Sequence, residues 1–376
     1  MERSNMKKRI VGVLAVGGVG LTAGEARAAW TANDLPGSCV DMSFVGNTTG
    51  FAAISSGIGG ASLYRTTTGA SWSKVTAAGF PAAATSIAYI DAGRGHAVAG
   101  SKATTAADAI ARTLDGGATW TPRPITLLPT TTGTNVALSR VSFATKNAGV
   151  AVGTLDGARG FVAITKNGGD TWTEIEAPAS TLLGGAVMIS ADDIVLAGAA
   201  PPADALTLWS SHDGGASFTV RYQGDAVGAG QSWSLDSVGG STYFLKGCGS
   251  PAGNAECVLK STNVGDTWTS PSAAFFGGTY RALAFSDAMH GIAAGAIGTA
   301  DVRVTTDGGQ TWTAAAAVGG IGGPLGCAAY PGPAAYAGTT GPLASIHDPA
   351  LGGGPRPPIP GAEPPDGGTS SSASSS

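Results

Sequence analysis

Side chains capable of acid–base or metal chemistry recur in this 376-residue chain within one eight-residue string. The third position of the string holds Asp115, Asn167, Asp213, Asn263 and Asp307, whose oxygens could ligate calcium or transfer protons. An aromatic residue closes each copy, and these aromatics are Trp72, Trp120, Trp172, Phe218, Trp268 and Trp312. They lie 44 to 52 residues apart, so each copy belongs to a separate repeat and the oxygens do not converge. The pattern therefore favours turn residues and packing anchors over a catalytic or metal site.

Other catalytic patterns are weak. The chain contains no G-x-S-x-G, Gly-Lys, H-E-x-x-H or C-x-x-C motif. His96 and His290 could form a metal pair, but both stand beside a glycine at nearly the same point of the repeat. That position predicts turn histidines. We therefore predict no catalytic residue, no cofactor and no metal site.

The string itself has the composition of a β-hairpin turn. Each copy follows an apolar strand such as Phe161–Thr165, and its Asp/Asn-Gly-Gly centre combines a short polar side chain with glycines that tolerate positive φ. The Thr-Trp-Thr that follows begins another strand. The copy at 65–72, RTTTGASW, has lost the acidic residue.

A second pattern lies upstream of each string, in which an apolar strand and a polar turn lead to a strand of small residues. Equivalent points are Phe44, Tyr89, Phe143, Ile189, Val238, Phe285 and Tyr330. Seven first strands but six strings are present, because the seventh string would fall in the proline-rich sequence near residue 359. Ala29-Trp30-Thr31 resembles the opening of the other fourth strands. The spacing predicts an all-β, seven-bladed β-propeller over residues 29–348, its last blade closed by the N-terminal strand.

The two ends of the chain differ from the repeats. Basic residues, an apolar run and Ala26-Arg27-Ala28 predict a signal peptide over 1–28, cleaved after Ala28, and therefore export to the periplasm, cell surface or medium. Residues 349–376 are rich in Pro, Gly and Ser, which predicts a disordered linker or tether.

Charge and cysteine content narrow the class of partner. Removal of residues 1–28 leaves 16 basic and 23 acidic residues, a net charge of −7, with the cations scattered. This excludes nucleic acid as an expected partner.

Cys39 and Cys327 occupy nearly the same place in the first and last repeats, so a ring brings them together, whereas Cys248 and Cys257 flank one hairpin turn. We expect these two disulfides, although other pairings stay open.

The repeated string resembles the Asp-box, or BNR repeat, and the whole unit resembles the propeller of the photosystem II stability/assembly factor family, within a sialidase-type superfamily. The resemblance covers 29–348 and implies that the Asp of the string lies in a peripheral turn and is not catalytic. Sialidases and xyloglucan-cleaving hydrolases share the repeat. However, the Arg-Ile-Pro signature of sialidases is absent, and Glu174 and Glu176 are expected on an outer strand.

These observations predict an exported, monomeric, non-enzymatic propeller that acts as a binding or assembly scaffold for an unknown protein or glycan, with no transmembrane segment in the mature chain. The alternatives are a sialidase-type or xyloglucanase-type hydrolase and a glycan-binding module. We expect binding at one mouth of the ring. The candidate contact loops are Ser101–Ala109, Ala199–Ala205 and Gly249–Ala255.

Overall fold

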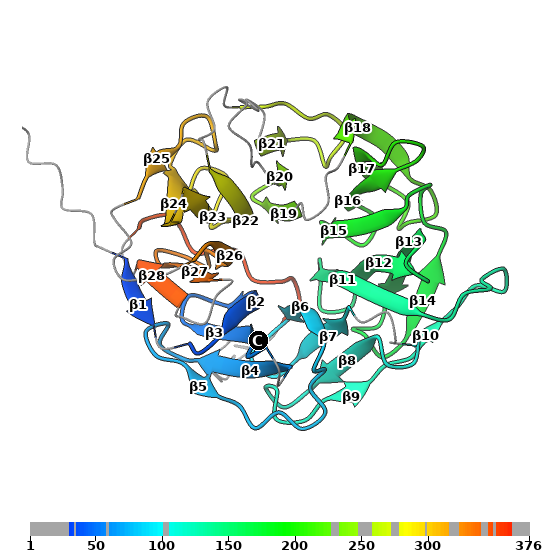
Figure 1. Cartoon of the computed structure of the whole chain (residues 1–376), viewed down its shortest axis with the longest axis horizontal. Coiled ribbons are helices and arrows are strands. Elements are labelled where there is room, and N and C mark those ends of the chain that lie inside the picture. The colour runs from blue at the N-terminus through cyan, green and yellow to red at the C-terminus, as the bar shows by residue number, and fades with distance from the viewer. Residues whose placement is uncertain are drawn as a thin grey trace, which may run out of the picture.

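The computed structural model describes residues 30–33, 35–57, 60–100, 105–226, 233–246, 258–271, 278–297, 299–315, 323–339, 345–348 and 351–362. The secondary-structure elements within these ranges are all β-strands. The strands form seven sheets that stand around a common axis as the blades of a propeller (Figure 1). The described chain is therefore an all-β propeller, and its strands, turns and glycines follow the repeat of the sequence.

Six sheets are each built from one continuous stretch of chain, and we number them blades 1 to 6 from the inner strand outward. Blade 1 contains β2 (Ser38–Val45), β3 (Thr49–Ser55), β4 (Ala61–Thr66) and β5 (Ser73–Lys74). Blade 2 contains β6 (Ala84–Tyr89), β7 (Gly95–Ala99), β8 (Ile110–Thr113) and β9 (Thr121–Pro122). Blade 3 contains β11 (Val136–Phe143), β12 (Gly149–Leu155), β13 (Arg159–Thr165), β14 (Trp172–Ile175) and β10 (Ile125–Thr126).

Blades 4 to 6 continue the same order. Blade 4 contains β15 (Leu182–Met188), β16 (Ile194–Ala200), β17 (Ala205–Ser211) and β18 (Thr219–Ala226). Blade 5 contains β19 (Trp233–Val238), β20 (Ser241–Lys246) and β21 (Val258–Ser261). Blade 6 contains β22 (Thr279–Phe285), β23 (Gly291–Ile297), β24 (Thr299–Thr305) and β25 (Thr313–Ala314).

The remaining sheet, blade 7, draws on both ends of the chain. It contains β26 (Leu325–Ala329), β27 (Ala335–Thr339) and β28 (Ser345–Asp348), and the short strand β1 (Thr31–Asn33) lies antiparallel to β28. The sequence placed Trp30 within this outer strand, and the structure corrects that assignment. Trp30 precedes β1, and its buried side chain packs with residues of blades 6 and 7, including Val302 and Tyr330.

The repeat implies four strands in each blade, and two blades depart from this number among the described residues. In blade 3 the additional strand β10 pairs parallel to β14 through Ile125 and Trp172, which gives five strands. In blade 5 only three strands are described, and an isolated bridge between Lys260 and Thr269 takes the place of a fourth. The outermost position is variable because an edge strand packs on one neighbour only, so its length is weakly constrained.

The second strands are buried on both faces because each blade packs face to face on the next. All seven residues of β16 are buried, and β12 is buried except for Thr154. Small and β-branched residues suit this position between two sheets. Each hydrophobic cluster spans two neighbouring blades, so the core is distributed around the ring; for example, Leu63 of blade 1 packs with Tyr89 of blade 2.

An aromatic anchor at the end of an inner strand joins blades at several places. Phe44, Tyr89, Phe143 and Phe285 each lie over a glycine of the adjacent second strand, where a Cβ atom would approach the ring within 2.4 to 2.7 Å. Each ring also stacks on an aromatic side chain of the preceding blade. These stacked pairs are Tyr336–Phe44, Phe51–Tyr89, His96–Phe143 and Tyr243–Phe285, with centroid distances of 4.4, 3.4, 4.5 and 3.5 Å. The anchor thus fixes the spacing between blades.

The eight-residue strings form one repeated turn between the third and fourth strand positions. In the copy of blade 2, the Thr113 hydroxyl accepts hydrogen bonds from the Asp115 and Gly117 amides, and Asp115 accepts bonds from the Thr119 amide and hydroxyl. Asn167 holds the same geometry because its Oδ1 accepts from the Thr171 amide while its Nδ2 donates to the Thr171 hydroxyl. The copies at Asp213, Asn263 and Asp307 repeat these contacts. The polar side chain therefore shapes the turn.

The closing aromatics differ in how they are held. Trp120, Trp268 and Trp312 donate Nε1–H to the carbonyl of the second glycine of their own turn. Trp172 is fully buried and Trp72 and Phe218 are half-buried. The Nε1 atoms of Trp72 and Trp172 have no hydrogen-bond partner among the described residues. In the altered copy, the Thr66 hydroxyl accepts from the Thr68 and Gly69 amides, as Thr113 accepts from Asp115 and Gly117 in blade 2. This turn is one residue shorter, so Thr68 takes the structural place of the Asp or Asn although Thr67 is the third residue of the string.

His96 is a core residue, which corrects its expected place in a turn. It lies on β7, fully buried, stacked on Phe143 and against Trp172. Neither ring nitrogen has a hydrogen-bond partner among the described residues. Burial, followed by the nearby Arg112 guanidinium, lowers the pKa of His96 to about 3, so the folded state keeps the imidazole neutral.

We predict that His96→Phe stabilises the protein most strongly in mild acid. The unfolded chain binds a proton near pH 6.5, whereas the folded state does not bind it until about pH 3. Between these values this group makes the unfolding free energy fall by about 1.4 kcal/mol for each unit of decreasing pH. Urea denaturation between pH 6 and pH 4 should show a smaller slope for His96→Phe. The reciprocal variant Phe51→His, at the same position of blade 1, should acquire the slope, and equal slopes in all three proteins would refute this account.

Val264 generates a second prediction because it replaces the first glycine of the repeated turn and adopts a φ of 60°. A β-branched residue is strained in this left-handed region. Val264→Gly should raise the unfolding free energy by about 1 kcal/mol. Gly214→Val is the matched control, since its φ is 69° and a Cβ would have room at 3.4 Å from the nearest atom. It should destabilise the chain in urea denaturation, and an unchanged midpoint in both variants would contradict the strain.

Candidate functional site

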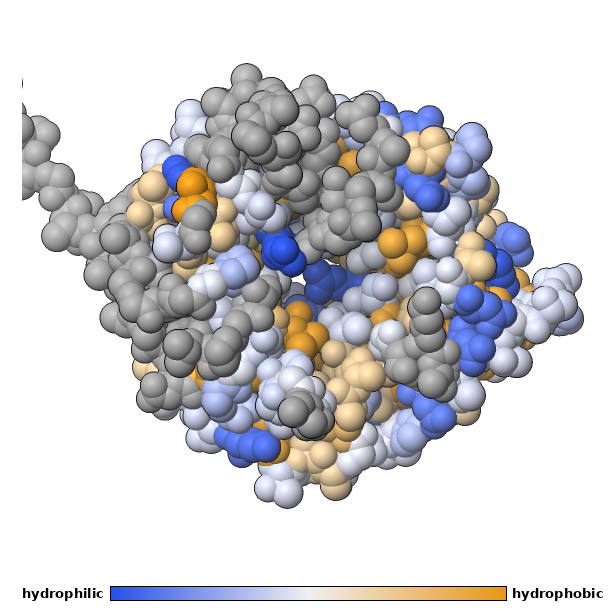
Figure 2. Space-filling model, in the orientation of Figure 1, coloured by the Kyte–Doolittle hydropathy of each residue, from blue (hydrophilic) through white to orange (hydrophobic). Residues whose placement is uncertain are grey.

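The inner strands surround a cavity of 310 Å³ on the ring axis. Figure 2 shows the molecule hollowed there, with hydrophilic residues in the wall. Six lining residues stand at β-bulges, one in each inner strand except β19; they are Val40, Thr85, Ser139, Gly184, Arg281 and Gly326. A bulge redirects a side chain from the sheet face. The repeated bulge therefore gives each of these six blades one residue at the axis.

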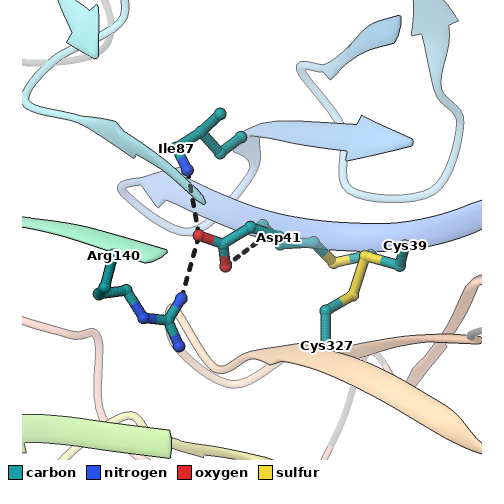
Figure 3. Close-up of a disulfide and its surroundings, with 6 residues drawn as sticks. Cys39, Asp41, Ile87, Arg140 and Cys327 are labelled. Atoms are coloured by element: carbon teal, nitrogen blue, oxygen red, sulfur yellow. Dashed lines mark hydrogen bonds and ion pairs between the residues drawn. A yellow bond between two sulfur atoms is a disulfide. The ribbon is translucent and has the colours of Figure 1, made fainter. Parts of the chain in front are cut away.

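The charged residues in this wall are Arg140 and Arg281. Arg140 forms an ion pair with Asp41, at 3.1 Å from Nη1 to Oδ2 (Figure 3). Asp41 also accepts hydrogen bonds from the Ser86 hydroxyl at 2.7 Å and from the Ile87 amide at 3.1 Å. The Asp41 carboxylate is therefore shared by blades 1, 2 and 3 and neutralises Arg140.

Arg281 and Trp233 are held differently. The buried Nε of Arg281 has no hydrogen-bond partner among the described residues, and the same is true of Nε1 of Trp233. Trp233 is 9% exposed, and its ring lies so close to Gly184 that a Cβ there would stand 2.5 Å from it. The cavity thus combines a guanidinium that forms no ion pair with a described residue and an indole N–H, and both are hydrogen-bond donors.

The two mouths of the ring are different. The bulged residues lie toward the start of the inner strands, at the mouth where loops join second and third strands; we call this the channel mouth. The opposite mouth, the turn mouth, is formed by the turns that join first and second strands. Two of the expected contact loops lie at the channel mouth: Ala199–Ala205, and residues 105–109 of Ser101–Ala109. Residues 101–104 lie outside the described ranges. All of Gly249–Ala255 also lies outside them.

Residues 351–362 cover the turn mouth, and this corrects the prediction of a disordered linker for that part of the tail. Arg356 forms an ion pair with Asp236 of blade 5, and the Lys146 amide of blade 3 donates to the Pro360 carbonyl. The segment lies on the ring because backbone hydrogen bonds and one charged pair replace the apolar core that its composition lacks. Residues 349–350 and 363–376 lie outside the described ranges.

The predicted disulfide between Cys39 and Cys327 is confirmed, with 6.0 Å between the Cα atoms (Figure 3). It joins the inner strands of blades 1 and 7. Gly338 leaves room for it, since a Cβ there would stand 2.6 Å from Sγ of Cys327. Cys248 and Cys257 lie outside the described residues.

The remaining candidate side chains lie away from the cavity. Glu174 is on outer strand β14, 1% exposed, and accepts hydrogen bonds from the Leu128 amide and Thr131 hydroxyl. His290 lies in a turn, as predicted, with Nδ1 at 2.9 Å from Asp287. Among the described residues, no three His, Cys, Asp or Glu side chains are grouped so as to hold a metal ion. The described part of the chain contains no helix that could cross a membrane.

The sequence did not identify Arg140 and Arg281 as site residues, because the basic residues are scattered along the chain. They are 141 positions apart, but they precede the anchors Phe143 and Phe285 by three and four residues. Position relative to the anchor was the available signal, because equivalent points of all inner strands meet at the axis of a propeller.

No protein-family model and no curated protein sequence matches the chain. Among solved structures, YCF48 bound to a D1 peptide aligns with a TM-score of 0.56 and 16% identity, over 86% of this chain and 98% of that one. YCF48 from Cyanidioschyzon merolae aligns with a TM-score of 0.54 and 16% identity, over 85% and 98%. U3-55K aligns with a TM-score of 0.56 and 11% identity, over 86% and 99%. These similarities show a β-propeller fold, which YCF48 and U3-55K share.

We predict that loss of the Cys39–Cys327 bond weakens the whole ring. The double variant Cys39→Ser/Cys327→Ser should lower the unfolding free energy by about 2 to 5 kcal/mol, since the bond constrains 288 residues of chain. Urea denaturation followed by tryptophan fluorescence measures the effect. The same variant treated with reductant is the control for the other two cysteines, and a midpoint equal to that of the wild type would contradict the prediction.

Proposed function

We propose that this chain is a non-enzymatic scaffold that binds an acidic segment of a partner protein at the channel mouth. The observation that carries this proposal is the Arg281 guanidinium, whose buried Nε lacks a described partner in a cavity to which every blade contributes. A carboxylate is the complementary ligand because it accepts two parallel hydrogen bonds from a guanidinium.

Trp233 extends the site beyond charge. Its Nε1–H offers a further donor, and its ring supplies apolar area beside Arg281. Tryptophan and arginine at the centre of a concave surface are typical of residues that contribute most to binding. The Arg140–Asp41 pair holds the neighbouring wall in place. An arriving carboxylate would thus meet donors that are already positioned.

The structural neighbours support a peptide ligand. One YCF48 structure has a bound D1 peptide and shares the propeller fold with this chain. The repeated turn, with its Thr–Asp/Asn–Gly–Thr hydrogen bonds, also supports assignment to the Asp-box class suggested by the sequence. Within that class we favour an assembly-factor role over hydrolysis, since the charged residues that line the cavity are arginines, whereas glycoside hydrolysis uses a pair of carboxylates.

Export remains part of the proposal. The Cys39–Cys327 bond suits an oxidising compartment, and the predicted signal peptide over 1–28 would deliver the chain there as a monomer. We predict that mass spectrometry of the protein secreted by its own host will find Ala29 as the first residue, as cleavage after Ala28 requires. Secreted protein that retains residues 1–28 would contradict this prediction.

Peptides selected by display on the immobilised full chain test the binding site. We predict that selected peptides carry acidic side chains or a free terminal carboxylate, and that Arg281→Gln weakens their binding at least about tenfold, as loss of a charged hydrogen bond would. Fluorescence anisotropy of a labelled peptide measures the affinity.

Arg159→Gln is the matched control, because Arg159 pairs with Glu174 at the outer edge of blade 3. It should leave the affinity unchanged. Selected peptides that are neutral, or an equal loss in both variants, would contradict the channel site. Tight binding of glycans with no selected peptide would favour the glycan-binding alternative.

A further inference from the structure

Residues 351–362 lie in the turn mouth in the manner of a bound peptide. The segment runs from blade 7 past blades 6 and 5 to blade 3, and Figure 1 shows it in red beside β26. Its backbone is held at both ends. The Gly352 carbonyl accepts from the Tyr330 hydroxyl at 2.7 Å, and the Pro360 carbonyl accepts from the Lys146 amide at 2.9 Å.

Arg356 makes the most specific contact. Its Nη1 and Nη2 donate to the two carboxylate oxygens of Asp236 at 2.9 and 2.5 Å, and to the Phe285 and Ser237 carbonyls at 3.0 and 3.1 Å. Its own amide donates to the Pro331 carbonyl at 2.8 Å. A forked pair with two further carbonyl acceptors matches the planar guanidinium and does not match an ammonium group.

The path before Arg356 is narrow and lined by polar groups. A Cβ on Gly353 would stand 2.4 Å from Oγ of Ser286, so only glycine fits beside this side chain. The Gly354 amide donates to Asp287 at 2.9 Å. Burial would raise the pKa of Asp287, but hydrogen bonds from the Gly354 and Met289 amides and from His290 lower it to about 2. Asp287 is therefore charged at neutral pH.

The ends of the segment pack in separate hydrophobic clusters. Leu351 contacts the cluster of blades 6 and 7, and Ile359 and Ala362 contact the cluster of blades 2 and 3. The segment is thus held by hydrogen bonds to its backbone, by a close contact that only glycine permits, by one bidentate ion pair and by apolar contacts at both ends. Sites that recognise extended peptides use the same kinds of contact.

We propose that the turn mouth is a recognition site for extended glycine- and proline-rich segments that carry one arginine, and that residues 351–362 are its occupant in cis. Asp236 is the specificity-determining residue. The site is separate from the channel mouth, and it accepts the same segment from a second copy of the chain when its own segment is displaced. The cis segment has the advantage of a high effective concentration because it follows β28 directly.

The test uses the full chain and a fluorescent synthetic peptide of residues 351–362. Hydrogen–deuterium exchange should show slow amides at Gly354 and Arg356 in the wild type and faster exchange there in Arg356→Gln. The released mouth of Arg356→Gln should bind the peptide at least about tenfold more tightly than the wild type does, since no complete cis segment competes. Arg94→Gln is the matched control, because Arg94 also pairs with an aspartate, Asp91, but does so within the first turn of blade 2; it should behave as the wild type.

Two further arms test specificity. The peptide with glutamine in place of Arg356 should lose binding to the Arg356→Gln chain, and the chain with both Arg356→Gln and Asp236→Asn should not bind the original peptide. Unchanged exchange at β22 in that chain checks that the blades remain folded. Slow tail amides in Arg356→Gln, no binding of the peptide by that chain, or equal binding of both peptides would each overturn the proposal.

Discussion

The contact between neighbouring blades is the constraint on which the rest of this structure depends. An aromatic anchor lies between a glycine of its own blade and a ring of the preceding one, as Phe44 lies between Gly50 and Tyr336. The repeated turn adds a second contact, because its second glycine faces the preceding blade. A Cβ on Gly69 would stand within 3.0 Å of Tyr336 Cζ, and one on Gly169 within 2.7 Å of His96 Cδ2. Both contacts require glycine on one side, which explains the glycines that recur at these two points of the repeat. Since the same spacing recurs around the ring, equivalent points of the inner strands meet at the axis.

That geometry makes the two mouths chemically different. The bulges near the start of the inner strands place Arg140 and Arg281 beside one cavity, with Asp41 neutralising only the first. At the other mouth Asp236 and Asp287 face a segment of the chain itself, and Arg356 neutralises Asp236. The channel mouth therefore presents a positive charge, that of Arg281, without an ion-pair partner among the described residues, while at the turn mouth the Asp236 charge is already paired. An acidic segment of a partner protein would therefore be attracted to the channel mouth.

The sequence predicted the elements that each repeat encodes locally. The glycines and Thr-Trp pairs of the repeated turn are adjacent in the chain, so periodicity was sufficient to predict strands, turns and the propeller fold. The Cys39–Cys327 bond followed because the two residues occupy equivalent places. Features that depend on contacts between blades were not predictable in this way. A β-bulge brings Arg281 to the axis, and the ring of Phe143 from the next blade helps to bury His96. Arg356 is held by the carboxylate of Asp236, 120 positions earlier. The Pro- and Gly-rich composition of 351–362 suggested disorder. The residues that hold this segment in place lie far from it in the sequence, so composition alone did not reveal them.

The central claim is that a peptide ligand enters at the channel mouth and leaves residues 351–362 in place. Photo-crosslinking tests it most directly, with a display-selected acidic peptide that carries a diazirine and with crosslinked residues located by mass spectrometry. The account predicts crosslinks to Trp233, Gly184 and Gly326 and none to Pro331, Pro333 or the tail. Crosslinks concentrated on Pro331, Pro333 and residues 352–356, with the cavity unlabelled, would contradict it.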